Sequence, residues 1–117
     1  MDCVSGACLL VRRAVYERAG LLDERFFLFW EDADWCLRFR RAGSKVYYLP
    51  TAVGTHHVGV SRAQRPIRSA IDFHRSAYWF YRKHHLASPF HPMVIPLVCG
   101  LLIGLALRAL QAVLARR

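Results

Sequence analysis

The feature that most constrains the fold is the stretch FFLFWEDADW at residues 26–35. Five apolar, mostly aromatic residues there run directly into three carboxylates that stand within four positions. The whole chain carries 8 Asp and Glu against 17 Lys and Arg, so three acids gathered behind an aromatic run stand out. Acidic side chains are favoured in the first turn of a helix, where they offset the helix dipole. The stretch therefore predicts a helix that begins at Glu31, with carboxylates that face a cleft and Asp32 as a candidate general base.

Composition limits the class of protein. A chain of 117 residues is long enough for one small domain. Its hydrophobic fraction of 55% is high for a soluble domain of this size and indicates unusual burial or contact with a membrane. The formal net charge of +9 implies an anionic partner, such as phospholipid headgroups, nucleic acid or a phosphorylated substrate. The four cysteines form no CxxC pair, so we expect reduced, mostly buried thiols rather than a zinc knuckle.

Local patterns predict an α/β chain built from short strands and helices. Short apolar runs predict strands at residues 7–11, 45–49 and 52–57. Apolar residues at helical spacing predict helices at residues 13–19, 31–42 and 67–85. Gly20 and Gly43 follow the first two helices directly, and glycine commonly ends a helix at that position.

The C-terminal part differs from the rest of the chain in its long uncharged run. Residues 93–107 carry no charge, and basic residues flank the run on both sides. The run is shorter than the roughly 20 apolar residues of a full bilayer span, and it contains Pro96 and Gly100. We therefore expect a hydrophobic amphipathic helix at the membrane surface or shallowly inserted, in preference to a full span. On this basis the chain divides into a domain at residues 1–88 and a membrane-associated helical tail at residues 89–117.

The acidic cluster has two interpretations. In the first, its carboxylates only cap and neutralise a helix start. In the second, Asp32 lies on the helix face shared with Trp35 and Cys36, and the rigid helix start holds it within reach of a substrate hydroxyl. Asp34 points elsewhere, one turn before Arg38, and an i,i+4 ion pair is expected there.

Two basic clusters add candidate binding residues. His56 and His57 stand at the end of an expected strand, where one imidazole can bind a divalent metal or a phosphate oxygen. The polar face of the helix at 67–85 carries arginines that include Arg75, and guanidinium groups suit a diphosphate or lipid headgroups. Each cluster also has a plainer interpretation, as surface histidines and as a solvated helix face.

Segments spread over residues 5–86 form an ordered series. They are SGACLLVRR at 5–13, GLLDERFF at 20–27, EDADWCLR at 31–38, RAG at 41–43, YLP at 48–50, HxxGxS at 56–61, HRS at 74–76 and YRKH at 81–84. The series resembles the C-terminal half of a family 2 glycosyltransferase of the rhamnosyl- or galactofuranosyltransferase type. A single motif of this kind would be weak, whereas the ordered series is specific.

The resemblance implies an incomplete GT-A type α/β fold. It also implies inverting transfer of a sugar from a nucleotide-diphosphate sugar to a hydroxyl of a glycan or lipid-linked acceptor, as in cell-wall or polysaccharide biosynthesis. The aspartate of the family's Glu-Asp pair removes the acceptor proton, and this role carries over onto Asp32, with Glu31 as its neighbour. Gly6, Ala7 and Trp30 would line the acceptor side.

The resemblance also implies a divalent metal, Mg²⁺ or Mn²⁺, and the histidine near it carries over onto His56. The family's D-x-D metal motif and its nucleotide-binding units belong to an N-terminal half. The D-x-D at residues 32–34 lies at the acceptor-side helix and is not taken for that motif. We therefore expect part of an enzyme at the cytoplasmic face of the cell membrane, with a separate N-terminal half chain as partner.

One alternative is a non-catalytic basic protein of the membrane surface, derived from such an enzyme. The net charge and the hydrophobic tail would be sufficient for that role. Nucleic acid is not an expected partner, because the sequence contains no base-stacking motif or recognition helix of a known module.

Overall fold

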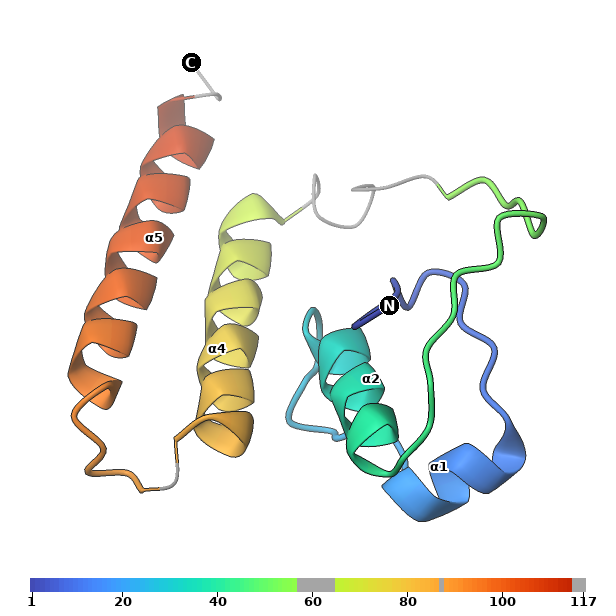
Figure 1. The fold of residues 1–117 in the computed structure, drawn as a ribbon. Helices are drawn as coiled ribbons and strands as arrows, with labels where there is room; N and C mark the ends of the chain where they lie inside the picture. The colour runs from blue at the N-terminus through green and yellow to red at the C-terminus, as the bar shows by residue number, and fades with distance from the viewer. Residues whose placement is uncertain (57–64, 87, 115–117) are drawn as a thin grey trace.

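The structure is a computed structural model that describes residues 1–56, 65–86 and 88–114. The helices in these residues are α1 (Arg13–Ala19), α2 (Glu31–Arg41), α4 (Pro66–His84) and α5 (Val94–Leu114) (Figure 1). The first three confirm the helices predicted from the sequence, with ends that differ by one residue at most. The expected hydrophobic C-terminal helix is also present, as α5.

The predicted strands are wrong for the described residues, which contain no β-strand. Segments 7–11 and 45–49 run instead as open stretches of chain without a paired neighbour (Figure 1). A strand exists only when a neighbouring strand supplies hydrogen-bond partners for its backbone, and the described residues supply none. The third predicted strand is equally absent over residues 52–56, and residue 57 lies outside the described residues.

Glycines end the two N-terminal helices, as the sequence indicates. Gly20 has a φ of 82°, and its N–H donates to the Tyr16 carbonyl over 2.7 Å. Gly43 has a φ of 77° and donates to the Arg40 carbonyl over 3.0 Å. Residues other than glycine rarely adopt this left-handed backbone conformation. Helix α2 also carries acids in its first turn and arginines in its last, which complements the helix dipole.

Helix α4 lies between α5 and the α1–α2 part of the chain (Figure 1). The buried apolar side chains of the described residues form a small core. They are Phe26, Cys36, Phe39, Val46, Ala70 and Ala77. Helices α4 and α5 approach closely at Gly104. A Cβ built on this glycine would lie only 2.9 Å from Nε2 of the buried His74.

The thiols are all free in the structure, as expected. The prediction that they are mostly buried is wrong, because Cys36 is buried and the other three are exposed. The exposed thiols of Cys3 and Cys8 lie on the open N-terminal segment, which no packed layer covers.

Helix α5 is long and apolar enough to cross a membrane, judged by length and composition alone. It has 21 residues and a mean hydropathy of 2.1, and none of its most apolar window is buried. At 1.5 Å per residue its length is close to the roughly 30 Å of a bilayer's hydrocarbon core. Pro96 does not interrupt it, because the residue falls in the first turn, where a missing N–H removes no helical hydrogen bond.

Candidate functional site

Asp32 stands in the first turn of α2, half-buried, with both carboxylate oxygens held by backbone amides. Its Oδ2 accepts a hydrogen bond from the Gly6 N–H over 2.9 Å. Its Oδ1 accepts one from the Ala33 N–H over 2.8 Å. A carboxylate oxygen can accept two hydrogen bonds, so each oxygen keeps a free lone pair. The carboxylate is therefore fixed in orientation and still able to accept a proton.

A cleft of about 560 Å³ borders this carboxylate, and we call it the Asp32 cleft. Segment 5–7, residues 28–33, His56 and Phe73 of α4 line it. Six residues selected from the sequence meet there, although they come from distant parts of the chain. They are Gly6, Ala7, Trp30, Glu31, Asp32 and His56. The seventh, Arg75, lies on an exposed face of α4 and does not line the cleft.

Gly6 keeps the approach to Asp32 open. A Cβ built at this position would lie 3.4 Å from the Asp32 Cβ and 3.7 Å from its Oδ2. These are ordinary contact distances, so a methyl group would fit without a severe clash. It would nevertheless cover the carboxylate on the side of segment 5–7.

The aromatic turn before α2 has unusual backbone geometry. Phe29 and Trp30 have φ values of 66° and 67°, in the left-handed region. This conformation costs about 1–2 kcal/mol for each residue with a side chain. The Trp30 ring packs against those of Phe73, Phe80 and Tyr81 on α4, with centroids 5.8, 5.1 and 6.1 Å away. This aromatic packing holds the strained turn, which forms one wall of the Asp32 cleft.

Two buried polar atoms at this wall have no hydrogen-bond partner in the described part of the chain. They are the indole Nε1 of Trp30, a donor, and Oε2 of Glu31, an acceptor. Burial raises the pKa of the Glu31 carboxyl, and the negative charge of Asp32 adds to the effect. An unsatisfied buried polar group costs about 1–3 kcal/mol. A polar ligand that paired with either group would therefore gain affinity.

Asp34 is the best-connected acid in the described structure, with its side chain 0% exposed. Arg38 Nε donates to its Oδ2 over 2.9 Å, which confirms the predicted ion pair. Lys83 Nζ and His84 Nε2 lie 2.7 and 2.6 Å from its Oδ1. Burial raises the pKa of Asp34, but the hydrogen bonds from Lys83 and His84 and the Arg38 charge outweigh it, so the pKa lies below its ordinary value. The sequence indicated only a helix-end residue paired with Arg38. In the structure Asp34 also contacts Lys83 and His84.

These contacts join three helices. The Arg38 guanidinium also donates to the carbonyls of Ala19 and Leu21, over 2.6 and 2.7 Å, where α1 ends. Lys83 also contacts Asp23 Oδ2 over 2.7 Å. We refer to this group of side chains as the Asp34 network, which consists of Asp34, Arg38, Lys83 and His84.

His84 takes part in the network as a neutral imidazole. Arg41 Nη1 lies 2.8 Å from its Nδ1, and arginine can only donate, so Nδ1 is the acceptor. Nε2 therefore carries the hydrogen and donates a hydrogen bond to Asp34. Burial lowers the pKa of His84 and outweighs the opposite effect of Asp34; the nearby Arg41 and Lys83 charges lower it further.

The sequence predicts a divalent metal near His56, and we tested whether the residues present fit one. Among the described residues, no group of three His, Cys, Asp or Glu side chains is arranged to hold a metal ion. His57, the neighbour considered with His56, lies outside the described residues. The described side chains alone therefore do not fit a metal ion.

Sequence reasoning missed Lys83 and His84 as partners of Asp34. Basic residues in a last helical turn complement the dipole of their own helix, so their presence there indicates no particular carboxylate. One sign was available, because both residues belong to the YRKH segment that contributes to the family resemblance.

Comparison with known proteins assigns the chain to a family. The family model described as "Glycosyltransferase like family 2" matches residues 1–88, well over half of the chain. The chain therefore belongs to glycosyltransferase family 2. Membership implies a GT-A type fold, of which the described residues form an incomplete, helical part.

Within this family the chain is similar to rhamnosyltransferases. The N-acetylglucosaminyl-diphospho-decaprenol L-rhamnosyltransferase of Mycobacterium tuberculosis is 38% identical over 82 residues, which cover 70% of this chain and 27% of that protein. The dTDP-rhamnosyl transferase RfbF of Shigella flexneri is 31% identical over 85 residues, or 66% of this chain and 29% of the relative. Rhamnosyltransferase WbbL of Escherichia coli is 33% identical over 57 residues, covering 49% of this chain and 22% of the relative. The chain thus spans between a fifth and a third of the length of these relatives, and no solved structure matches it.

Proposed function

We propose that the chain supplies the acceptor side and the general base of an inverting glycosyltransferase. The observation that carries the proposal is the mounting of Asp32, whose carboxylate is held by two backbone amides at the wall of a cleft. Membership of family 2 supports a sugar nucleotide as donor. The M. tuberculosis relative is named for a lipid-linked sugar diphosphate, which favours a glycan or lipid-linked acceptor here.

In the proposed reaction an acceptor hydroxyl donates a hydrogen bond to Asp32. As the hydroxyl oxygen bonds to the anomeric carbon, its proton passes to the Asp32 carboxylate. The bond between that carbon and the diphosphate breaks, and the nucleotide diphosphate leaves with the electron pair. One displacement from the opposite side inverts the anomeric configuration. Trp30 and Glu31 line the same cleft and are proposed to contact other parts of the acceptor.

The donor is proposed to approach from the His56 side of the cleft. His56 lines the cleft together with Asp32, and an imidazole there can bind a phosphate oxygen. The rest of the donor site, including ligands for Mg²⁺ or Mn²⁺, would come from a separate N-terminal half chain. Arg75, exposed on α4, is proposed to contact phosphate groups of a lipid-linked acceptor.

The test is the Asp32→Asn variant, assayed together with a donor-binding half. That half is the part of the M. tuberculosis relative outside its matched segment, with a nucleotide-diphosphate rhamnose as donor and N-acetylglucosaminyl-diphospho-decaprenol as acceptor. We expect transfer to fall by about 10²–10⁴-fold, the usual contribution of a general base. Asp2→Asn is the matched control, since Asp2 is exposed and, among the residues that the structure describes, pairs only with Arg40 on the surface. Turnover retained in Asp32→Asn would remove Asp32 from the role of base.

A second candidate function is a non-catalytic membrane-surface protein, favoured by the apolar helix α5, none of whose most apolar window is buried, and by the net charge of +9. In both candidates we propose a position at the cytoplasmic face of the membrane, peripheral or shallowly inserted. The test compares binding to anionic and to neutral liposomes as salt is raised. The second candidate predicts salt-sensitive binding to anionic liposomes with no transfer under any reconstitution, and transfer that depends on Asp32 would exclude it.

A further inference from the structure

A smaller cavity, of about 370 Å³, lies between the start of α4 and the C-terminal half of α5, and we call it the interhelix pocket. Its polar lining consists of Ser69 on α4 and of Arg108 and Gln111 on α5. The rest of the lining is apolar and includes Phe29 and Pro66. Phe29 also lines the Asp32 cleft, so the two cavities adjoin each other at this side chain.

Arg108 is the only charged residue of α5. Its guanidinium carbon lies 4.5 Å from the centroid of the Phe73 ring, and Phe73 lines the Asp32 cleft. The eight Asp and Glu of the chain all belong to the described residues, and none of the ion pairs there includes Arg108. A cation on an otherwise apolar helix indicates a functional contact when that helix meets a membrane. The structure therefore calls for an anion from outside the chain.

The two adjoining cavities differ in charge. The carboxylates of Glu31 and Asp32 line the cleft, whereas no carboxylate lines the interhelix pocket in the part of the chain that the structure describes. A phosphate group is repelled by the first and attracted by the second. The guanidinium fork matches two phosphate oxygens at once, and the Ser69 hydroxyl and Gln111 amide are further donors. The pocket thus suits a phosphate or diphosphate.

The surface of α5 around Arg108 is apolar. Leu107, Leu110 and Leu114 stand close to Arg108 along the helix, and each is more than half exposed. Apolar surface is stabilised when a hydrocarbon chain covers it. A sugar nucleotide in solution has no such chain, whereas a lipid phosphate has one. The pocket and its surroundings therefore fit a phosphate group that carries a lipid.

We propose that the interhelix pocket binds the diphosphate of a lipid-linked acceptor and that Arg108 holds it. The lipid chain lies along the exposed apolar side of α5, and the acceptor sugar extends past Phe29 into the Asp32 cleft. The proposal rests on the proposed function in taking that cleft as the place of the acceptor sugar. The family model ends at residue 88, so Arg108 lies outside the part of the chain that the family match covers.

The experiment measures sedimentation of the full chain with neutral phosphatidylcholine vesicles. The vesicles contain decaprenyl diphosphate, uncharged decaprenol, or phosphatidylglycerol at the same total negative charge as the diphosphate. We expect binding to the diphosphate vesicles to be about tenfold or more tighter than to the other two, the size of one charge-assisted hydrogen bond. The phosphatidylglycerol vesicles distinguish a lipid diphosphate from an ordinary membrane headgroup.

Variants of Arg108 locate the contact. Arg108→Gln should lose the preference for the diphosphate, by about tenfold or more. Because the side chain is exposed, its thermal unfolding should stay close to that of the wild type. Arg108→Lys keeps the charge without the planar fork, so it should recover part of the preference.

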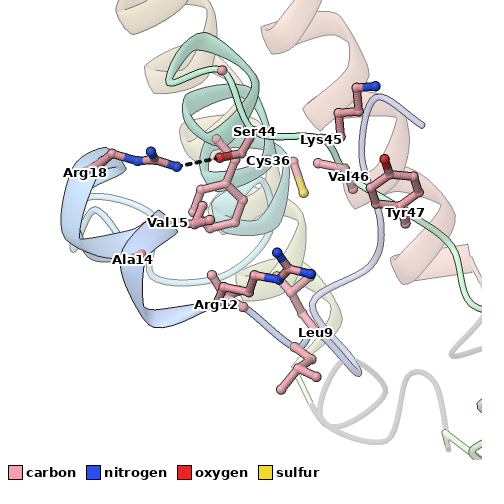
Figure 2. Close-up of a pocket in the computed structure, with 14 residues that line it drawn as sticks. Leu9, Arg12, Ala14, Val15, Arg18, Cys36, Ser44, Lys45, Val46 and Tyr47 are labelled. Atoms are coloured by element: carbon pink, nitrogen blue, oxygen red, sulfur yellow. Dashed lines mark hydrogen bonds between the residues drawn. The ribbon is translucent and has the colours of Figure 1, made fainter.

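Arg12→Gln is the matched control, because it removes the same charge from another exposed position. Arg12 lines a separate cavity of about 590 Å³ beside α1 and α2 (Figure 2). In the described part of the chain, that cavity shares no lining residue with the Asp32 cleft or the interhelix pocket. The preference for the diphosphate should therefore be unchanged in this variant.

Three results would overturn the proposal. An equal loss in Arg108→Gln and Arg12→Gln would show attraction by net charge alone. Equal binding to diphosphate and phosphatidylglycerol vesicles would assign the pocket to ordinary phospholipid. A larger loss in Arg75→Gln than in Arg108→Gln would place the diphosphate at Arg75, which lines neither cavity.

Asp32→Asn separates this proposal from the proposed function. It should abolish transfer and leave the preference for the diphosphate intact. Binding that depends on Arg108, without transfer that depends on Asp32, would refute the proposed function alone. Transfer that depends on Asp32, with diphosphate binding unchanged in Arg108→Gln, would refute the role of Arg108 alone.

Discussion

Two aspartates near the start of α2, Asp32 and Asp34, show how different surroundings give identical side chains different roles. Asp32 is half-buried at a cleft, and backbone amides are its hydrogen-bond donors. Asp34 is fully buried, and side chains from α2 and α4 are its donors. Residues two apart on a helix point about 200° apart around its axis. The same turn of helix can therefore hold one carboxylate toward a ligand and the other toward the interior.

The comparison teaches which carboxylate can act as a base. A base needs access and a free lone pair, and Asp32 has both. Asp34 has neither access nor basicity, because hydrogen bonds from Lys83 and His84 and the Arg38 charge lower its pKa despite burial. The D-x-D spelling at residues 32–34 therefore does not describe a pair of carboxylates with a shared task.

The largest expected effect comes from Asp34→Ala. The change removes the anion shared by the Arg38, Lys83 and His84 side chains, whose contacts join three helices. Breaking a buried ion pair costs about 3–5 kcal/mol, a large part of the free energy of unfolding of a small domain. Urea unfolding followed by tryptophan fluorescence measures the loss. Asp34→Asn keeps the size and one acceptor oxygen and should lose less, and an equal, small loss in both variants would contradict a structural role for the network.

Asp32→Asn should give the reverse pattern. The amide keeps the shape of the side chain, so the free energy of unfolding should change by less than about 1 kcal/mol. The transfer rate measured with the donor-binding half should fall by the factor given above. A variant that unfolds as easily as Asp34→Ala would show that the two aspartates share a structural task, against the division argued here.

Stability should fall as the pH is lowered, and His84 should account for part of the fall. The pKa of His84 is lowered in the folded chain, so the unfolded chain binds its proton first and stability is lost as pH falls below about 6.5. The lowered pKa of Asp34 adds a further loss below about pH 4. His84→Gln keeps a donor for Asp34 and cannot titrate, so its unfolding free energy should change less between pH 7.5 and 5.5. Equal slopes in wild type and variant would show that His84 does not titrate with folding.

The smallest expected effect is that of Gly6→Ala. The added methyl group covers one side of Asp32 at ordinary contact distance, so the free energy of unfolding should stay within about 0.5 kcal/mol of wild type. Transfer should fall severalfold, because the methyl group hinders the approach of the acceptor to Asp32. Gly54→Ala is a matched control, since a Cβ at Gly54 meets nothing within 4 Å. Full activity in Gly6→Ala would show that the acceptor does not approach from this side.

The helices were predictable because their determinants are local. Gly20, Gly43 and the acids at 31–34 all act within one turn of the helix that they end or begin. The strands were not, because a strand depends on neighbours that the described residues do not provide. A pattern that is typical of a strand gives open chain where the described residues contain no strand to pair with it.

The site divides in the same way. The ordered segments of the sequence were enough to select six residues that meet in the Asp32 cleft. In the Asp34 network the ion pair with Arg38 was predicted, whereas the contacts with Lys83 and His84 were not, because His84 lies 50 positions from Asp34 along the chain. Its existence depends on how the end of α4 packs against α2, and no spacing within either helix encodes that contact.

The close approach of Gly104 to His74 has a consequence for how deeply the tail can enter a bilayer. Helices α4 and α5 lie side by side and run in opposite directions (Figure 1). Helix α4 carries Arg68, Asp72 and Arg75, and each charge taken to the bilayer centre costs about 2.5–3.5 kcal/mol on insertion scales. If α5 meets a bilayer while it stays paired with α4, these charges would therefore keep it near the surface. Crossing the bilayer would require α5 to separate from α4, and with that separation the close approach at Gly104 would be lost.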